Sequence, residues 1–91
     1  MNVHFDWDED KECSNIKKHG IDFESASFVF LDENRIEIYD ELHSDTENRF
    51  ITIGMAEEVL TVVYTERNSS IRIISARCAT KKEKERYYHG Y

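Results

Sequence analysis

The chain has 91 residues, 40% hydrophobic and 12% aromatic, a globular composition that fits a single domain over residues 1–91 and excludes a second core. Its 12 Lys and Arg against 19 Asp and Glu give a net charge of −7, which argues against independent binding to a nucleic-acid duplex. The charge is divided, because residues 1–48 carry 14 acids and 4 bases whereas residues 49–91 carry 5 acids and 8 bases. An acidic half suits a basic partner and a basic half suits an anion; the alternative is a merely acidic, soluble surface.

The first half of the sequence predicts one strand and two helices. Residues 3–7 alternate apolar and polar side chains, as in a short strand. Asp8 can cap a helix that continues to about His19, where a run of basic residues suits the helix C-terminus. Asp22 can cap a second helix, which we expect to end near residues 31–32.

The second half predicts strands followed by a final helix. The strand patterns cover about residues 35–39, 48–55, 59–65 and 71–76. Their short connections favour hairpins, so sequential neighbours should pair antiparallel. Thr80 and Glu83 have the spacing of a capping box, which should begin a helix that runs to about Tyr88. The order β-α-α-β-β-β-β-α predicts an α+β fold in which helices cover one face of an antiparallel sheet of four or five strands.

Two further features concern cellular location and metals. Cys13 and Cys78 are too few for a disulfide scaffold, no apolar run approaches a membrane span, and the first residues do not resemble a signal peptide, so we expect a cytoplasmic protein with reduced cysteines. No histidine or cysteine pair has metal-ligand spacing, and there is no nucleophile elbow or glycine-rich phosphate loop. We therefore predict no metal site and no cofactor.

Lys18 and His19 lie at the predicted end of the first helix. The helix dipole favours cations there, which is a sufficient structural reason for both residues. The functional alternative is that Lys18 contacts a phosphate while the His19 imidazole transfers a proton near neutral pH. Tyr64 has a similar pair of interpretations, because tyrosines can stack on bases or pack against the edge of a core.

Four arginines lie on or beside consecutive predicted strands, namely Arg49, Arg67, Arg72 and Arg77. Guanidinium groups bind phosphate bidentately and keep their charge, so antiparallel pairing that gathers them would create an anion site. The alternative is that each is a solvated strand residue paired with a nearby acid such as Glu47 or Glu66. Arg72 and Arg77 are five residues apart, so a regular strand would point them to opposite faces unless the strand ended near Ala76.

The sequence as a whole resembles a known family. The resembling segments are Phe5-Asp6-Trp7-Asp8, Lys18-His19-Gly20-Ile21, Asp45 to Gly54, Val62 to Arg67, Ile71 to Arg77, and Ala79-Thr80 with Glu83, Arg86 and Tyr87. In this order, over about residues 5–88, they resemble BrnT-type toxins of bacterial type II toxin–antitoxin systems. The resemblance implies a small ribonuclease with a RelE-like fold. It also implies a BrnA-type antitoxin partner, which would bind the toxin through one region and DNA through a ribbon-helix-helix region.

The resemblance further implies metal-independent cleavage, in which the 2′-hydroxyl of the RNA attacks the adjacent phosphorus. On this hypothesis Arg49 and Arg77 stabilise the negative charge, His19 transfers the proton and Lys18 is a second cation. The remaining candidates would bind the RNA, namely Arg67, Arg72, Lys81 and Tyr64. Two alternatives are an inactive binding module that serves only as the antitoxin's partner, and a small metalloprotein.

Overall fold

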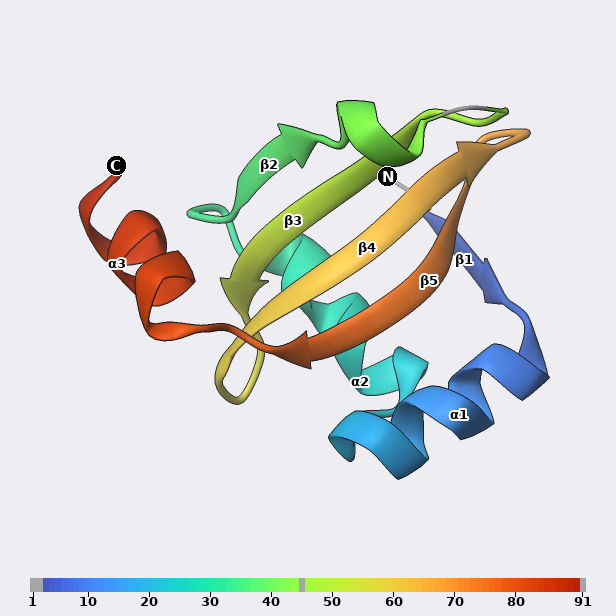
Figure 1. Cartoon of the computed structure of the whole chain (residues 1–91), viewed down its shortest axis with the longest axis horizontal. Coiled ribbons are helices and arrows are strands. Elements are labelled where there is room, and N and C mark those ends of the chain that lie inside the picture. Colours follow the sequence, from blue (N-terminus) through green and yellow to red (C-terminus); the bar gives the residue numbers. More distant parts are fainter. Residues whose placement is uncertain (1–2, 45, 91) are drawn as a thin grey trace.

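The computed structural model describes residues 3–44 and 46–90. The elements are β1 (His4–Trp7), α1 (Glu9–His19), α2 (Phe23–Ser27), the 3₁₀ helix η1 (Phe28–Leu31), β2 (Ile36–Tyr39), the 3₁₀ helix η2 (Glu41–His43), β3 (Arg49–Met55), β4 (Val59–Arg67), β5 (Ser70–Cys78) and α3 (Lys81–His89). The α+β class and the order of strands and α-helices are confirmed. The strands form one five-stranded sheet in the order β1-β5-β4-β3-β2 (Figure 1).

The sheet is mixed. The consecutive strands β2 to β5 pair antiparallel, as the short connections predict. β1 pairs parallel with β5, which corrects the expectation of an entirely antiparallel sheet. Parallel pairing is available here because the long segment containing α1 and α2 separates β1 from the other strands and carries the chain back.

The helix ends follow the predicted capping signals. The Asp8 side chain accepts a hydrogen bond from the Lys11 N–H at 3.0 Å, and Gly20, at φ +73°, closes α1 in the left-handed conformation. The capping box of α3 is present in full, since the Thr80 hydroxyl accepts from the Glu83 N–H and the Glu83 carboxylate accepts from the Thr80 N–H. Local sequence therefore determines where these helices begin and end.

One face of the sheet, which we call the helical face, packs against α2 and η1, with α2 behind the sheet in Figure 1. Its core is formed by Phe23, Ala26, Val29, Leu60, Val62, Ile73 and Ala76. Gly54 lies where η1 approaches β3 closely, because a Cβ there would be 2.7 Å from Val29 Cγ1. A side chain at this position would push η1 away from the sheet.

The other face, which we call the open face, is covered only at one end, by α3. Ile53, Val59 and Ala79 form a second small core there, against which Tyr87 packs. The Tyr87 hydroxyl donates to Asp32 Oδ2 at 2.5 Å, a contact that raises the pKa of Tyr87 to about 12. The expectation that the helices cover a single face is therefore wrong for α3. None of the helices in residues 3–44 and 46–90 is both long and apolar enough to cross a membrane.

A β-bulge interrupts the pairing of β4 with β5. Val63 lies opposite Ser75 and Tyr64 lies opposite Ile73, so Ile74 is an extra residue in β5. Beside the bulge, the Asn15 amide of α1 donates to the Ala76 carbonyl at 2.8 Å and accepts from the Ala76 N–H at 3.1 Å. The buried Asn15 side chain thus takes the place of a neighbouring strand where β1 has already ended.

Candidate functional site: the basic face of the sheet

All four predicted arginines lie on the open face, and a bulge in β5 explains why Arg72 and Arg77 share it. Arg72 lies opposite Thr65 and Arg77 lies opposite Thr61, and these two threonines are four residues apart on β4 and so share a face. The inserted Ile74 changes the alternation of β5, which is why Arg72 and Arg77 point the same way although five residues separate them. The sequence-based parity argument is therefore wrong, and β5 also continues past Ala76 to Cys78.

Three of the arginines are neighbours. Arg49, Thr65 and Arg72 form one row across β3, β4 and β5. Arg67 is two residues beyond Thr65 on the same face, so it is the diagonal neighbour of both arginines, at a usual Cα separation of about 7–8 Å. We call Arg49, Arg67 and Arg72 the arginine cluster.

Two members of the arginine cluster carry counter-ions. Arg67 forms two hydrogen bonds of 2.5 Å with the Glu47 carboxylate, and Arg72 contacts Asp6 at 3.2 Å. The Arg67 hydrogen bonds, followed by the charges of Arg67, Arg72 and Arg49, hold the pKa of Glu47 below its usual value. Arg49 makes no ion pair with any described carboxylate. Such exposed ion pairs are weak, so a phosphate of the RNA can replace the carboxylates at Arg67 and Arg72. Arg49 can bind a phosphate without first releasing a carboxylate.

Arg77 lies at the other end of the open face. The four residues from Thr65 to Thr61 correspond to roughly 13 Å at the usual strand rise, and Arg49 is two strands, roughly 10 Å, across from Arg77. Their Cα atoms are therefore roughly 16 Å apart. The predicted catalytic residues Arg49 and Arg77 share a face, but the structure does not place them side by side.

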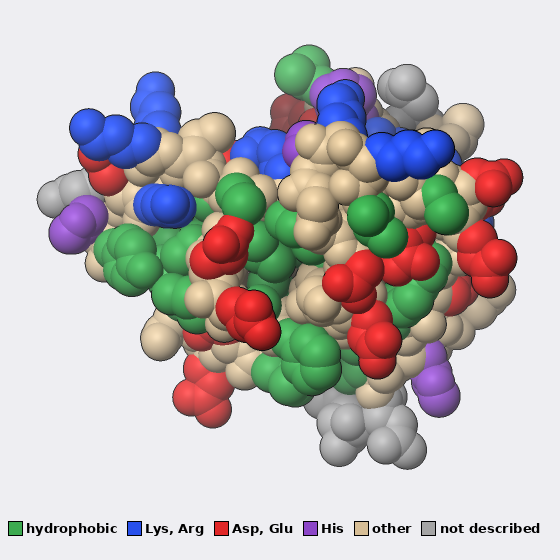
Figure 2. Space-filling model, turned by 90° about the horizontal axis from the view of Figure 1, so that it is seen from below, with side chains coloured by type: hydrophobic (Ala, Val, Ile, Leu, Met, Phe, Trp, Pro, Cys, Tyr) green, Lys and Arg blue, Asp and Glu red, His purple; other side chains and the backbone are tan. Residues whose placement is uncertain are grey.

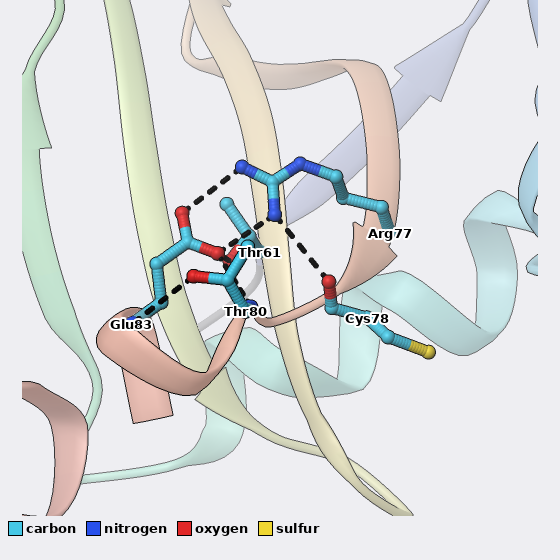
Figure 3. A network of polar contacts seen from close by, with 5 residues as sticks. All are labelled: Thr61, Arg77, Cys78, Thr80 and Glu83. Carbon is cyan, nitrogen blue, oxygen red and sulfur yellow. Dashed lines mark hydrogen bonds and ion pairs between the residues drawn. The ribbon is translucent and has the colours of Figure 1, made fainter. Parts of the chain in front are cut away.

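The Arg77 guanidinium is held by α3 (Figure 3). It donates to Glu83 through two hydrogen bonds, of 2.7 and 2.9 Å, and to the Cys78 carbonyl at 3.4 Å. Glu83 also accepts from the Thr61 hydroxyl at 3.0 Å. The Arg77 hydrogen bond is the main reason that the pKa of Glu83 falls to about 2. The geometry fixes Arg77 at the junction of β5 and α3 while leaving its side chain 40% exposed.

This pair makes a prediction about stability and pH. Glu83 has its pKa lowered from 4.5 to about 2, so its ionised form stabilises the fold above about pH 4.5, and this contribution is lost as the pH falls toward 2. Glu83→Gln keeps a capping acceptor but removes the charge. We expect it to reduce the free energy of unfolding by about 2 kcal/mol at pH 7 and by little near pH 2. Urea denaturation followed by circular dichroism across this range measures the difference, and a gap that does not change with pH would contradict the assignment.

Lys18 and His19 lie beside β5 rather than within the arginine cluster. Both are exposed, and they line a shallow groove of about 410 Å³ between α1 and β5 together with Ile74 and Ser75. Ser75 lies opposite Val63, midway between the rows of Arg72 and Arg77, so this groove reaches the open face between the arginine cluster and Arg77. Lys81, also exposed, is the first residue of α3, the helix that holds Arg77.

Between the arginine cluster and α3, the open face has a half-buried floor. Ile51, Val63 and Ser75 form the next row across β3, β4 and β5. Positive groups therefore border a less polar strip, an arrangement that suits a single-stranded nucleic acid with its phosphates at the rims and its bases over the strip. Figure 2 shows that Lys and Arg side chains gather along the upper border of that view, whereas acidic side chains occupy its middle.

Tyr64 is excluded from this surface. Its side chain is 2% exposed and lies on the helical face, stacked on Phe50 at 5.4 Å with its hydroxyl bonded to Glu37. Burial first, and then this hydrogen bond, raise the pKa of Tyr64. The ring has no surface to offer a base in this conformation, so base stacking by Tyr64 has no support in the structure. Tyr64 instead packs against the core, which is the other interpretation of this residue.

Sequence reasoning missed the carboxylates that hold Arg72 and Arg77. Asp6 is 66 residues from Arg72 and meets it only through the parallel register of β1 with β5, whereas Glu83 meets Arg77 where the chain turns from β5 into α3. The pairing of Arg67 with Glu47, which the sequence offers as an alternative to phosphate binding, is present in the structure. Within residues 3–44 and 46–90, no group of three or more His, Cys, Asp and Glu side chains is placed to hold a metal ion.

Comparisons with known proteins agree with one another. The sequence model of the family described as "Ribonuclease toxin, BrnT, of type II toxin-antitoxin system" matches residues 7–83. The chain is also similar to the 1.1 Å crystal structure of the Brucella abortus ribonuclease toxin BrnT, with 25% identity and a TM-score of 0.69 over 88% of this chain and 100% of that one. No curated protein matches the chain. Since the family match covers most of the sequence, the chain belongs to the BrnT family of ribonuclease toxins of type II toxin–antitoxin systems.

Proposed function

We propose that this protein is an endoribonuclease that cleaves single-stranded RNA without a metal ion and is neutralised by a BrnA-type antitoxin. The observation that carries the proposal is that four arginines share one face of an otherwise acidic chain, with the bulge at Ile74 placing Arg72 and Arg77 on the same side. Phosphate recognition needs such a local concentration of guanidinium groups. Family membership supports ribonuclease activity, and the geometry supports the choice of face.

In the proposed reaction the RNA supplies its own nucleophile. The 2′-oxygen forms a bond to phosphorus, the bond from phosphorus to the 5′-oxygen breaks, and the products are a 2′,3′-cyclic phosphate and a 5′-hydroxyl. The proton lost from the 2′-hydroxyl is balanced by the one gained by the leaving oxygen. His19 exchanges this proton, and Lys18 and Arg77 stabilise the charge on the phosphate oxygens.

The spacing of the open face divides the cations into two roles. Lys18 and His19 line a groove whose Ser75 lies between the rows of Arg72 and Arg77. Because Glu83 holds the Arg77 guanidinium in a fixed position, we place the reacting phosphate at the Arg77 end. The arginine cluster lies too far from Arg77 to hold the same phosphate and would bind neighbouring phosphates of the RNA backbone. Lys81, on α3 beyond Arg77, would also bind the RNA backbone. We therefore assign Arg49 to binding of the RNA backbone, and not to charge stabilisation at the reacting phosphate.

The antitoxin partner follows from the type II family and from the charge of the chain. Residues 1–48 carry ten more acids than bases, which suits a basic protein surface rather than DNA. DNA binding would then belong to the ribbon-helix-helix region of the antitoxin.

The test is cleavage of a defined single-stranded RNA by the purified chain in EDTA. We expect EDTA-resistant cleavage that leaves 2′,3′-cyclic phosphate ends, stops when antitoxin is added, and fails on the same RNA carrying 2′-O-methyl groups. Cleavage that requires added magnesium, or that proceeds on the 2′-O-methyl RNA, would contradict the mechanism. A folded chain that binds antitoxin tightly but cleaves nothing would identify the inactive binding module.

A further inference from the structure

A hollow of the structure lies away from the arginine cluster. It has a volume of about 710 Å³ and is formed by the loop between α1 and α2 together with the turn between β3 and β4. Its apolar lining includes Ile21, Phe28 and Leu60. The volume is within the usual range of about 300–1,000 Å³ for binding pockets, so it can accept one or two bulky side chains of a partner.

Phe28 gives this hollow an unpartnered apolar wall. Its side chain is 55% exposed, whereas Phe23, in the same short helical segment, is completely buried. The core is complete without Phe28, which is absent from both packed clusters. An aromatic side chain half exposed at the wall of a hollow is typical of an anchor for a protein partner.

The charged groups around the hollow are all acidic. Asp22, Glu57 and Glu58 line it, and no Lys or Arg is among its lining residues. Hydrogen bonds from Ser25 hold the pKa of Asp22 below its usual value, so this carboxylate stays ionised. Three carboxylates repel RNA and attract Lys and Arg, which makes the charge of the hollow opposite to that of the open face.

We propose that this hollow is the docking site for a basic amphipathic segment of the neutralising antitoxin. The segment places an apolar side chain against Phe28 and sets Lys or Arg side chains opposite Asp22, Glu57 and Glu58, in the manner of a helix bound in a groove. The inference rests on the proposed function in one respect, namely that an antitoxin supplies the segment.

The hollow lies at the same end of the sheet as Arg77 but on the other face. The Cys78 thiol donates a hydrogen bond to Glu58, and Cys78, opposite Leu60, points to the helical face, whereas Arg77, opposite Thr61, points to the open face. A segment seated against Glu58 therefore leaves Arg77 uncovered. Inhibition would then require the rest of the antitoxin to pass around this end of the sheet and separate the RNA from Arg77.

The test compares two hollow variants with two matched controls. Phe28→Ala and the double variant Glu57→Gln/Glu58→Gln remove the anchor and two charges from the hollow. Leu42→Ala removes an 85% exposed apolar side chain elsewhere, and Glu33→Gln/Glu41→Gln removes two exposed charges elsewhere. The probes are a 15-residue helical peptide of leucine and lysine, a leucine and glutamate peptide of the same pattern, and the purified antitoxin.

We expect the leucine and lysine peptide and the antitoxin to bind about tenfold more weakly to each hollow variant than to the wild type or the controls. The glutamate peptide should not bind. Equal binding by hollow variants and controls, or no binding of the lysine peptide to the wild type, would overturn the docking site. RNA cleavage without antitoxin should be unchanged in all four variants. Absence of RNA cleavage by the wild type would instead overturn the proposed function. The binding measurements do not require cleavage, so the two failures are distinguishable.

Discussion

Replacing Arg77 with alanine is expected to lower the rate of RNA cleavage by about 10²–10³-fold, the usual effect of removing one preorganised donor from an oxyanion site. Arg77 is held at the junction of β5 and α3 by Glu83 and is 40% exposed on the open face, two residues from Ser75 in the groove of Lys18 and His19. Its guanidinium is therefore both fixed and accessible. The measurement is the single-turnover rate on a short RNA, with circular dichroism to show that the variant is folded.

The controls separate catalysis from the structural role of Arg77. Glu83→Gln removes the carboxylate partner but keeps the guanidinium, so it should lower stability and reduce cleavage far less than Arg77→Ala does. Lys17→Ala removes an exposed positive charge from α1 that does not line the groove, and it should leave the rate unchanged. A folded Arg77→Ala variant that cleaves at the wild-type rate would contradict the assignment.

Replacing Arg49 with alanine is expected to weaken the binding of a non-cleavable 2′-O-methyl RNA more than replacing Arg67. Arg49 has no described carboxylate partner, whereas Arg67 must give up its two hydrogen bonds with Glu47 before it can bind a phosphate. We expect a loss of affinity of about tenfold for Arg49→Ala. The slope of log affinity against log salt should become less steep by about 0.7, the value for one phosphate contact on a single strand.

Fluorescence anisotropy across a range of salt concentrations measures both quantities. Lys17→Ala is the matched control, because it changes the net charge equally but lies outside the open face. If Arg49→Ala and Lys17→Ala reduce affinity and salt dependence equally, the effect comes from net charge and the arginine cluster is not a binding site.

The sequence predicted the elements of the fold well, because local chemistry determines them. Asp8, Gly20 and the Thr80–Glu83 pair carry capping signals that act within one helical turn, and the structure uses each of them. Strand alternation identified the strands for the same reason. What local patterns could not show is the side of the sheet on which α3 packs, because this depends on residues distant in sequence. Tyr87 packs against the cluster of Ile53 and Val59 and donates to Asp32, 55 residues away.

The site was less predictable because it depends on one inserted residue. Nothing in the composition of Ile73-Ile74-Ser75 indicates a bulge, yet the bulge decides whether Arg72 and Arg77 share a face. The Asn15 side chain bonds to the strand beside the bulge from 61 residues away. The sequence predicts that Tyr64 can reach RNA, but its ring is buried. The sequence alone does not show whether the ring of a single tyrosine in a strand is buried or exposed.

The most direct test of the account is an NMR titration of the arginine Nε–H signals with the non-cleavable 2′-O-methyl RNA. Each guanidinium reports on its own surroundings, and Arg35, which contacts Glu37 and Thr52 on the helical face, is an internal reference. We predict that the signals of Arg49, Arg67, Arg72 and Arg77 shift together as RNA is added while that of Arg35 stays in place. Shifts at Arg35 without shifts at these four would show that RNA does not bind the open face, and would contradict the account.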